Sequence, residues 1–441
     1  MISENISTGN ITMNEEEFTR ENIEKNKQIK LVDSDVEAGL DLFSYIHCEP
    51  TDSEIIKRCR GVVFKGDQVV MKGFPYTYEL NEEDNVPEIR EKIDMENCSF
   101  YDSHEGSVIR MFYFNGKWYL STNRKLDAFR SKWASKDSFG SFFKKALQYE
   151  FENNEKLIEK IGEYNKETDI ENVINIFADK CLDQNKQYMF LLLNNKENRI
   201  VCNQSETPTI FHVGTFIDGN LSMDENVGIQ YPQRHYFKTI EDLLRYVYNV
   251  DYKKLQGVIV FAPNNLQIKV FNKDYHYLYN VRGNEPSIKF RYLQVRTNID
   301  FKESMYFLYP EYSGNFDKYE NYIFDIAGDI TNSYIDRFIK KNYVTVPVEE
   351  FNVIRKCHSW HIENRLENKI NVNKVIEILN AEPPTNINRM IKRRILSEKD
   401  GEQPTSTDEN KNKERKNNIR PDNRKKKYIS ILTNKPVSNL S

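Results

Sequence analysis

The chain has 441 residues, of which 39% are hydrophobic and 29% are charged, and its formal net charge is −4. This length and composition are typical of two or three folded domains, and they argue against a disulfide-dependent miniprotein or a wholly disordered chain. No segment has the roughly 18 to 20 uncharged apolar residues of a membrane span, and residues 1–18 lack the features of a signal peptide, so no membrane partner is expected.

Composition divides the chain into four parts. Residues 1–28 are polar and acidic without apolar periodicity, as expected of a flexible N-terminal arm. Residues 29–295 contain short apolar runs separated by turns, and residues 296–397 have the periodicity of helices. Residues 398–441 are rich in Gln, Pro, Ser, Asn and Lys, which predicts a disordered basic tail. The predicted fold class is therefore α+β with a helical C-terminal domain.

Three hairpins are expected in the β-rich part. The clearest joins residues 107–114 to 117–122 through Asn115-Gly116, because Asn-Gly is the strongest short turn signal. The other two join 61–64 to 68–71 and 257–261 to 267–271. Further strands are predicted at 188–193, 199–203 and 209–216, and helices at 138–161, at 240–247 and from 319 onward.

The six cysteines are spread along the chain without a C-x-x-C pair. This spacing defines neither a disulfide framework nor a zinc ribbon, and it favours a reducing compartment. We therefore expect an intracellular protein, either cytoplasmic or viral. The charges are uneven along the chain, because residues 411–427 include nine basic and two acidic residues.

Several short motifs occur in a specific order. They are C-R-G-V-V-F at Cys59–Phe64, S-H-E-G-S at Ser103–Ser107, and Q-G-V-I-V at Gln256–Val260 followed by Ile268-Lys269-Val270, with supporting segments at Phe74–Glu82 and Asn198–Val201. Together they resemble the covalent nucleotidyltransferases, and most closely the bacteriophage RNA ligase 1 type, over residues 50–285.

The resemblance implies a nucleotidyltransferase domain of antiparallel sheets with flanking helices. In that family a lysine attacks the α-phosphorus of ATP and holds AMP as a phosphoramidate. Carboxylates are the oxygen ligands that a hard divalent cation such as magnesium requires. ATP and magnesium are therefore the cofactors that an active enzyme of this type would use.

Four positions depart from the family pattern. Ser103 stands where the nucleophilic lysine belongs, and a serine phosphate ester would lack the easily protonated nitrogen that lets AMP leave. The glutamate of the middle motif is replaced by Leu192 or Leu193, and Gln256 replaces the glutamate of the E-G strand. Phe271 replaces the second of the paired lysines. No catalytic residue is therefore assigned.

Arg60, Glu105, Gly106 and Lys269 keep the residue types of the family. The resemblance implies that they face the phosphates of a nucleotide or of RNA. Each also has an ordinary structural interpretation, because Arg60 and Lys269 suit a solvated strand, and Glu105-Gly106 suits a turn that enters a strand.

Two other features concern metal and nucleic acid. His358 and His361 are three residues apart on a predicted helix, but two ligands fall short of a metal site, and no metal is predicted. The cluster Arg424-Lys425-Lys426-Lys427 is typical of a phosphate-binding arm or a nuclear localisation signal, although charge runs of this kind are often simply solvated.

Three hypotheses follow. The first is an RNA-ligase-like pseudoenzyme that binds RNA or docks a protein partner. The second is an active ATP-dependent RNA ligase whose nucleophile is displaced to Lys117 or Lys125 on the adjoining hairpin. The third is a structural or assembly protein of a large DNA virus. A covalent AMP adduct would separate the second from the others, and RNA binding would separate the first from the third.

Overall fold

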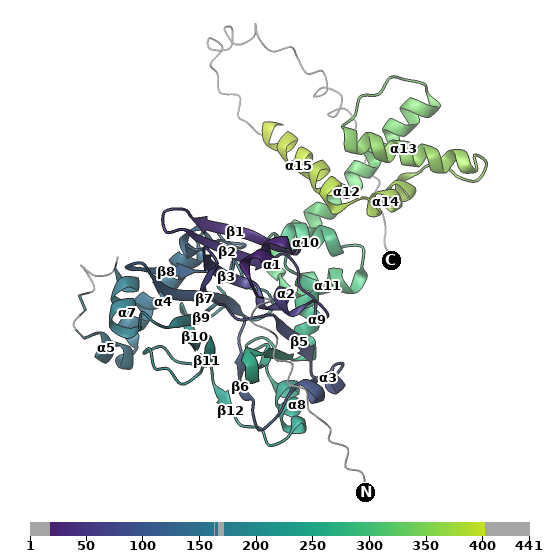
Figure 1. Cartoon of the computed structure of the whole chain (residues 1–441). Coiled ribbons are helices and arrows are strands. Elements are labelled where there is room, and N and C mark those ends of the chain that lie inside the picture. Colours follow the sequence, from purple (N-terminus) through teal and green to yellow (C-terminus); the bar gives the residue numbers. More distant parts are fainter. Residues whose placement is uncertain (1–17, 163, 166–171, 402–441) are drawn as a thin grey trace, which may run out of the picture. The chain divides into compact units, whose positions relative to one another are not determined.

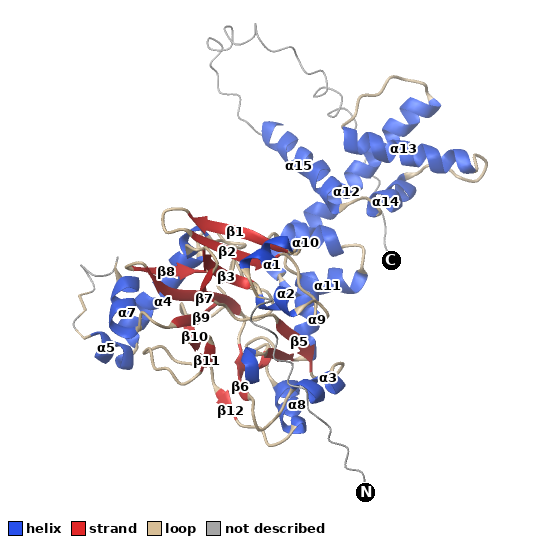
Figure 2. Ribbon diagram, in the orientation of Figure 1, coloured by secondary structure: helices blue, strands red, loops and turns tan. Residues whose placement is uncertain are grey.

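The computed structural model describes residues 18–162, 164–165 and 172–401, and it divides into two compact units, Met1–Pro286 and Ser287–Ser441. The first unit contains three β-sheets with surrounding helices, whereas the described residues of the second unit form helices and loops without strands (Figure 2). These features confirm the predicted α+β class with a helical C-terminal region.

The strands of the first unit pair in three sheets, and among the described strands every pair is antiparallel except β14 with β5. The first sheet has the order β1 (Ile29–Asp35), β2 (Leu40–Tyr45), β3 (Arg60–Lys65) and β4 (Gln68–Met71). The second has the order β11 (Asn220–Ser222), β10 (Ile210–Ile217), β9 (Gln187–Leu193), β7 (Gly106–Phe114) and β8 (Lys117–Ser121). The third has the order β12 (Arg234–His235), β6 (Ser99–Ser103), β13 (Gly257–Phe261), β14 (Gln267–Phe271) and β5 (Thr77–Asn81).

The described helices of the first unit lie around the three sheets (Figure 2). They are α1 (Arg20–Lys25), α2 (Glu54–Arg58), α3 (Val86–Lys92), α4 (Phe139–Asn153), α5 (Glu155–Ile161), α7 (Val173–Cys181), α8 (Ile240–Asn249) and α9 (Lys273–Arg282), with short 3-10 turns at Ala128–Arg130 and Pro263–Asn265. Helices α4, α5 and α7 lie together beside the second sheet (Figure 1), and their apolar side chains share a core with β7 and β9. Helices α3 and α8 cover the third sheet in the same way.

Successive residues along a strand of the third sheet lie in two different environments, because their side chains point to opposite faces. Val258 and Val260 of β13 pack with α3 and α8, whereas Ile259 and Phe261 point to the other face. That other face meets side chains of the first and second sheets in a shared core, to which Val63 and other residues contribute. The inner faces of all three sheets therefore converge, and the functional cavity described below lies among them.

The expected helix over residues 138–161 is two helices. Asn154 ends α4 and begins α5, because its side chain accepts a hydrogen bond from the amide of Leu157 at 3.2 Å. The hairpin at Asn115-Gly116 is confirmed, with φ of 49° and 79° at these two residues, which are the left-handed conformations that this turn requires.

The second unit is built around one long helix. Its elements are α10 (Ile288–Val295), α11 (Ile299–Leu308), a 3-10 turn at Pro310–Tyr312, α12 (Ser313–Tyr334), a π-helical turn at Ile335–Ile339, α13 (Val348–Glu363), α14 (Val372–Asn380) and α15 (Pro384–Gly401). Helix α12 packs against α13, α14 and α15. Ile323, Ile326 and Ile330 of α12 recur at helical spacing and are buried, as their sequence periodicity predicts.

The structure places two boundaries differently from the sequence expectation. The expected flexible arm, residues 1–28, includes α1, in which Ile23 is fully buried and Arg20 pairs with Asp41 at 2.6 Å. The second unit begins at Ser287 rather than at residue 296, because α10 packs on α11, α12 and α15. Most of the expected tail, residues 402–441, lies outside the described residues.

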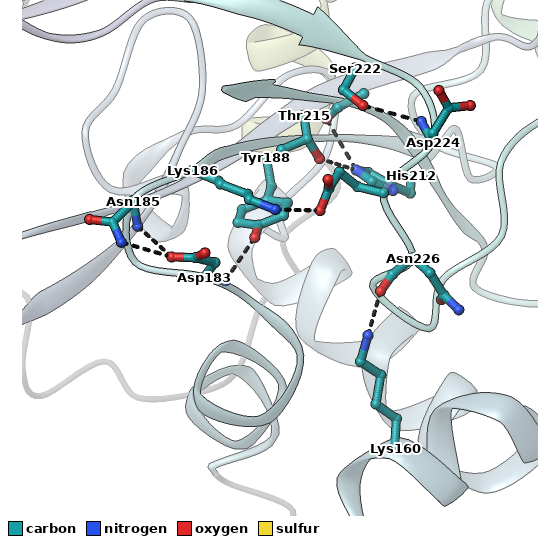
Figure 3. Close-up of polar contacts among 12 residues, drawn as sticks. Lys160, Asp183, Asn185, Lys186, Tyr188, His212, Thr215, Ser222, Asp224 and Asn226 are labelled. Carbon is teal, nitrogen blue, oxygen red and sulfur yellow. Dashed lines mark hydrogen bonds and ion pairs between the residues drawn. The ribbon is translucent and has the colours of Figure 1, made fainter. Parts of the chain in front are cut away.

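His212 of β10 is fully buried and lies next to Thr215, as Figure 3 shows. Its Nε2 atom lies 2.9 Å from Thr215 Oγ1 and 3.1 Å from the Gly214 carbonyl oxygen. Burial lowers the pKa of His212 to about 4. A protonated imidazole is therefore strongly disfavoured in the folded chain.

This burial predicts a pH-dependent stability. Because the folded pKa of His212 is about 4 and the unfolded pKa is about 6.5, the unfolded chain binds more protons between these values. The His212 contribution to the free energy of unfolding should thus fall by about 3 kcal/mol as pH drops through that window. We expect His212→Gln to remove this part of the pH dependence of the free energy of unfolding, as measured by urea titrations at several pH values. His47→Gln, at an exposed position, should leave that pH dependence unchanged. An equal pH dependence in all three proteins would contradict the assignment.

Candidate functional site

A cavity of about 480 Å³ lies where the inner faces of the three sheets meet. Its lining includes residues of β3, β5, β6, β7, β9, β13 and β14. Four basic side chains and two acidic ones contribute to the wall, namely Arg60, Arg124, Lys132, Lys269, Glu79 and Asp102. The cavity therefore has an excess of positive charge in a protein whose overall charge is negative.

Ser103 and Lys269 line this cavity, and both contact Gln256, which is buried and not among the lining residues. The Ser103 hydroxyl donates to Gln256 Oε1 at 2.8 Å, and Lys269 Nζ donates to the same oxygen at 3.0 Å. Gln256 Nε2 in turn donates to the Tyr275 hydroxyl at 2.6 Å. The antiparallel register of β6, β13 and β14 brings these residues together from positions up to 166 apart, because Ser103 pairs with Gly257 and Lys269 pairs with Ile259.

The environment of Lys269 perturbs its ionisation. Burial lowers the pKa of Lys269, the carboxylate of Glu79 opposes that shift, and the positive charge of Arg60 adds to it. Glu79 is the direct partner of Lys269 in the parallel pairing of β5 with β14. Glu79 is exposed, and the carboxylate of Glu105 also favours the charged form of Lys269.

Arg60 begins β3 and reaches the same cavity from the first sheet. Its Nη1 atom donates to Thr77 Oγ1 at 3.0 Å and to the Pro75 carbonyl at 3.2 Å. These bonds hold the guanidinium against β5, at the side of the third sheet where Lys269 also lies. The structure therefore brings together Arg60 and Lys269, the two basic residues of the sequence motifs.

Glu105 is placed differently from the expectation that it faces a bound phosphate. Its carboxylate accepts hydrogen bonds from the main-chain N–H groups of residues 200–202 at 2.6, 2.8 and 3.0 Å. Asn194 Nδ2 and the Tyr275 hydroxyl donate to it at 3.1 and 3.2 Å. Residues 200–202 form no strand, so their amide groups need an acceptor, and Glu105 supplies it. The residue is structural and does not line the cavity.

Gly106 lines the cavity, but packing alone explains the glycine. A Cβ atom at this position would overlap the carbonyl oxygen of Leu192, because β7 lies close against β9 there. The glycine lets the second sheet begin directly after the Ser103 position.

Neighbouring leucines of the middle motif face opposite sides of β9. Leu192 is buried in the core with α4 and α7, on the face of β9 away from the cavity. Leu191 lines the cavity, whereas Leu193 does not. Of these three leucines Leu191 is the one that lines the cavity, and the alignment of Leu192 or Leu193 with the family's glutamate stays a prediction.

Phe271 is fully buried and packs against Tyr275, with ring centroids 5.2 Å apart and the ring planes tilted by 48°. Lys269 Nζ lies 5.5 Å from the centroid of the Phe271 ring. Where the family has a second lysine, this protein thus has an aromatic ring that supports the remaining one.

The alternative nucleophiles do not reach the cavity. Lys117 is exposed at the tip of the β7–β8 hairpin and lies 3.5 Å from Asp35, and Lys125 lies 3.4 Å from Asp33. Neither lysine is among the lining residues. A displaced nucleophile at these two positions is therefore not supported by the geometry.

Other cavity residues were not predicted from the sequence. His104 lines the cavity and stacks on Phe211 with ring centroids 4.7 Å apart, and Lys132 and Trp133 come from a loop without any motif. Gln267 could have been found, because it lies two residues before Lys269 and strand alternation puts both on one face.

Arg110, which is fully buried, donates to the carbonyl groups of Gly61 and Thr122 and links β3 to the end of β8.

The histidine pair and the basic cluster singled out in the sequence belong to other parts of the chain. His358 of α13 stacks on Phe338 with ring centroids 3.8 Å apart. Within the described ranges no group of three or more His, Cys, Asp and Glu side chains is arranged to hold a metal ion. The basic cluster Arg424–Lys427 lies outside the described residues. A search of the described helices also finds none that is long and apolar enough to cross a bilayer.

Comparisons with known proteins point to viral relatives. No family model matches the chain. It is 27% identical over 372 residues to "Immediate-early protein ICP-46 homolog" of Invertebrate iridescent virus 6, covering 78% of this chain and 79% of that protein. It is 23% identical over 235 residues to "Putative bifunctional polynucleotide kinase/RNA ligase" of Autographa californica nuclear polyhedrosis virus, covering 51% of this chain and 30% of that protein.

Among solved structures, the chain is similar to "Putative ATP-dependent DNA ligase from Aquifex aeolicus". The sequence identity is 10% and the TM-score is 0.35, and the match covers 65% of this chain and 68% of the other.

The role found for Glu105 yields a stability prediction. Glu105→Gln keeps the shape but replaces one oxygen by an amino group, which cannot accept the bonds that converge on it. We expect the free energy of unfolding to fall by about 2 to 4 kcal/mol in urea titrations, because buried donors lose a charged acceptor. Glu37→Gln, at an exposed position outside the cavity, is the matched control and should change it by less than about 1 kcal/mol. Equal effects of the two substitutions would contradict the structural role of Glu105.

Proposed function

We propose that this protein binds single-stranded RNA through the cavity and does not transfer adenylyl groups. The observation that carries the proposal is the hydrogen bond from Ser103 to Gln256, next to Lys269. At this point the cavity offers cationic side chains to a phosphate, but its hydroxyl is buried and already engaged. It therefore has the means to bind a phosphate, and it lacks a lysine nucleophile at the Ser103 position, where the ligase family has one.

The charge distribution supports an anionic ligand. Arg60 and Lys269 face the cavity from two different sheets, and Glu79 is the acidic side chain closest to them in the strand pairing. Asp102, the other acidic residue of the wall, already accepts hydrogen bonds from His235 and Tyr246 at 2.8 Å each. A phosphate from outside the chain would complete the charge balance.

Aromatic side chains in the same wall support a nucleic acid over a simple anion. His104 is stacked on Phe211, and Trp133 also lines the cavity. Single-stranded RNA is commonly held by stacking of its bases on such rings together with cationic contacts to its backbone. The viral relative whose name includes RNA ligase is in keeping with RNA as the ligand.

The cavity does not fit a magnesium ion at the positions that the ligase family uses. The leucines of the middle motif and Gln256 stand where that family has carboxylates, and the hydrogen bonds to Asp102 engage a third acidic group. The proposed binding therefore requires neither a metal ion nor ATP. It depends on the cationic side chains of the protein itself.

RNA binding is tested with a fluorescent single-stranded oligoribonucleotide and the full chain. Lys269→Met should weaken binding about tenfold at low salt, because a desolvated cation that contacts a phosphate is lost. It should also reduce the slope of log affinity against log salt by about 0.7, the value for one phosphate contact. Arg60→Met should act in the same direction.

Lys117→Met is the matched control for the RNA measurement, since Lys117 is exposed and pairs with Asp35 away from the cavity. It should change the affinity by less than about twofold. A wild-type protein that does not bind this RNA at low salt would overturn the proposed function.

The absence of adenylyl transfer is tested with α-labelled ATP and magnesium. We expect no covalent label on the wild-type chain and none on Ser103→Lys, because the added lysine would still lack the carboxylates that the ligase family has in the middle motif and at the Gln256 position. Circular dichroism of each protein shows whether it is folded. A labelled adduct on folded wild-type protein would establish an active transferase and refute the pseudoenzyme proposal.

A further inference from the structure

Gln267 has an unsatisfied polar group in the wall of the cavity. It is the first residue of β14, its side chain is 2% exposed, and it lines the cavity. Its Nε2 amino group finds no hydrogen-bond acceptor in the described part of the chain. Buried polar groups in folded proteins are nearly always paired, so an unpaired amide that borders a cavity marks the place of an external acceptor.

The orientation of this amide follows from its other contacts. Arg60 Nη1 donates to Thr77 Oγ1 at 3.0 Å, and a guanidinium can only donate. The Thr77 hydroxyl has one proton of its own, and it donates this proton to Gln267 Oε1, 3.1 Å away. This chain of bonds fixes the carbonyl of Gln267 toward Thr77. The amino group is thereby left as the donor that remains for a ligand.

The neighbours of Gln267 define the kind of acceptor. Lys269 is two residues further along β14 and lines the cavity with it, and Arg60 touches the same Thr77 hydroxyl as Gln267 does. Three donors thus border one part of the cavity, two of them cationic and one neutral. A phosphoryl group has several non-bridging oxygens that accept from such a set, and a neutral amide adds a donor without repelling the two cations.

We propose that Gln267 is a ligand-binding residue whose amide donates to a non-bridging phosphoryl oxygen held by Arg60 and Lys269. Thr77 acts as a positioning residue that orients this amide. The proposal rests on the proposed function in one respect, namely that the bound ligand is the backbone of single-stranded RNA. It adds a contact that lies outside the motifs found in the sequence.

The test compares two substitutions of Gln267 with the same fluorescent oligoribonucleotide. Gln267→Met keeps the length of the side chain and removes the donor, and it should weaken binding about tenfold. Gln267→Glu keeps the shape, removes the donor and adds a negative charge, so it should weaken binding further. Gln68→Glu, at an exposed position of β4, makes the same change of charge outside the cavity and should stay within about twofold of wild type.

Urea titrations separate binding from stability. Gln267→Met removes the unpaired amino group but also the carbonyl that accepts the Thr77 hydroxyl proton, so the two effects oppose each other and the free energy of unfolding should stay within about 1 kcal/mol of wild type. Thr77→Val should weaken RNA binding because the orienting hydroxyl is lost, and Thr77→Ser should restore it. A loss of affinity without a loss of stability would support a ligand contact and not a structural role.

An abasic oligonucleotide of the same length distinguishes phosphate from base. If the amide contacts the backbone, Gln267→Met should lose the same factor with the abasic and the base-containing strand. A loss confined to the base-containing strand would overturn the phosphoryl assignment. If wild type binds RNA and Lys269→Met weakens it, but Gln267→Met stays within about twofold, the role of Gln267 is refuted while the proposed function stands.

Discussion

The cavity depends on the carboxylate of Glu105. This residue lies between the end of β6 and the start of β7, where the chain passes from the third sheet to the second. Its oxygens bind three consecutive main-chain N–H groups of residues 200–202 and the hydroxyl of Tyr275 on α9. One buried charge therefore joins two sheets, an irregular segment and a helix. Without that acceptor the amides of residues 200–202 would be buried unpaired, which is among the most costly defects in a folded protein.

The electrostatics of the cavity depend on the cationic side chains Arg60 and Lys269 and on the neutral amide of Gln256. Gln256 accepts from both Ser103 and Lys269 through one oxygen, but as a neutral group it does not balance the ammonium as a carboxylate would. Burial then lowers the pKa of Lys269, opposed by Glu79. A phosphate near Lys269 and Arg60 would favour their charged forms. The cationic side chains next to a neutral amide thus make this part of the cavity suited to an anion.

Much of the first unit could be predicted from local pattern. Asn115-Gly116 forces left-handed conformations that suit a tight hairpin, and the alternating apolar runs of β13 and β14 correspond to strands with two different faces. Other features could not be predicted, because local pattern does not contain them. Asn154 interrupts a continuous helical periodicity through a single capping bond. In β9, Leu191 lines the cavity and Leu192 is in the core. The sequence could not distinguish them, because a continuous apolar run has no alternation that shows which residues share a face.

The sequence by itself determined which chemical groups are available: a serine at position 103, a glutamine at 256, a lysine at 269 and an arginine at 60, each within a recognisable strand motif. Only the tertiary structure decided what these groups do. Glu105 serves residues about a hundred positions further along the chain, and Gln267 is left with a free amide because Thr77, from another strand, takes its carbonyl. Hydrogen bonding is a property of neighbours in space, and the strand pairing that creates those neighbours joins residues far apart in sequence.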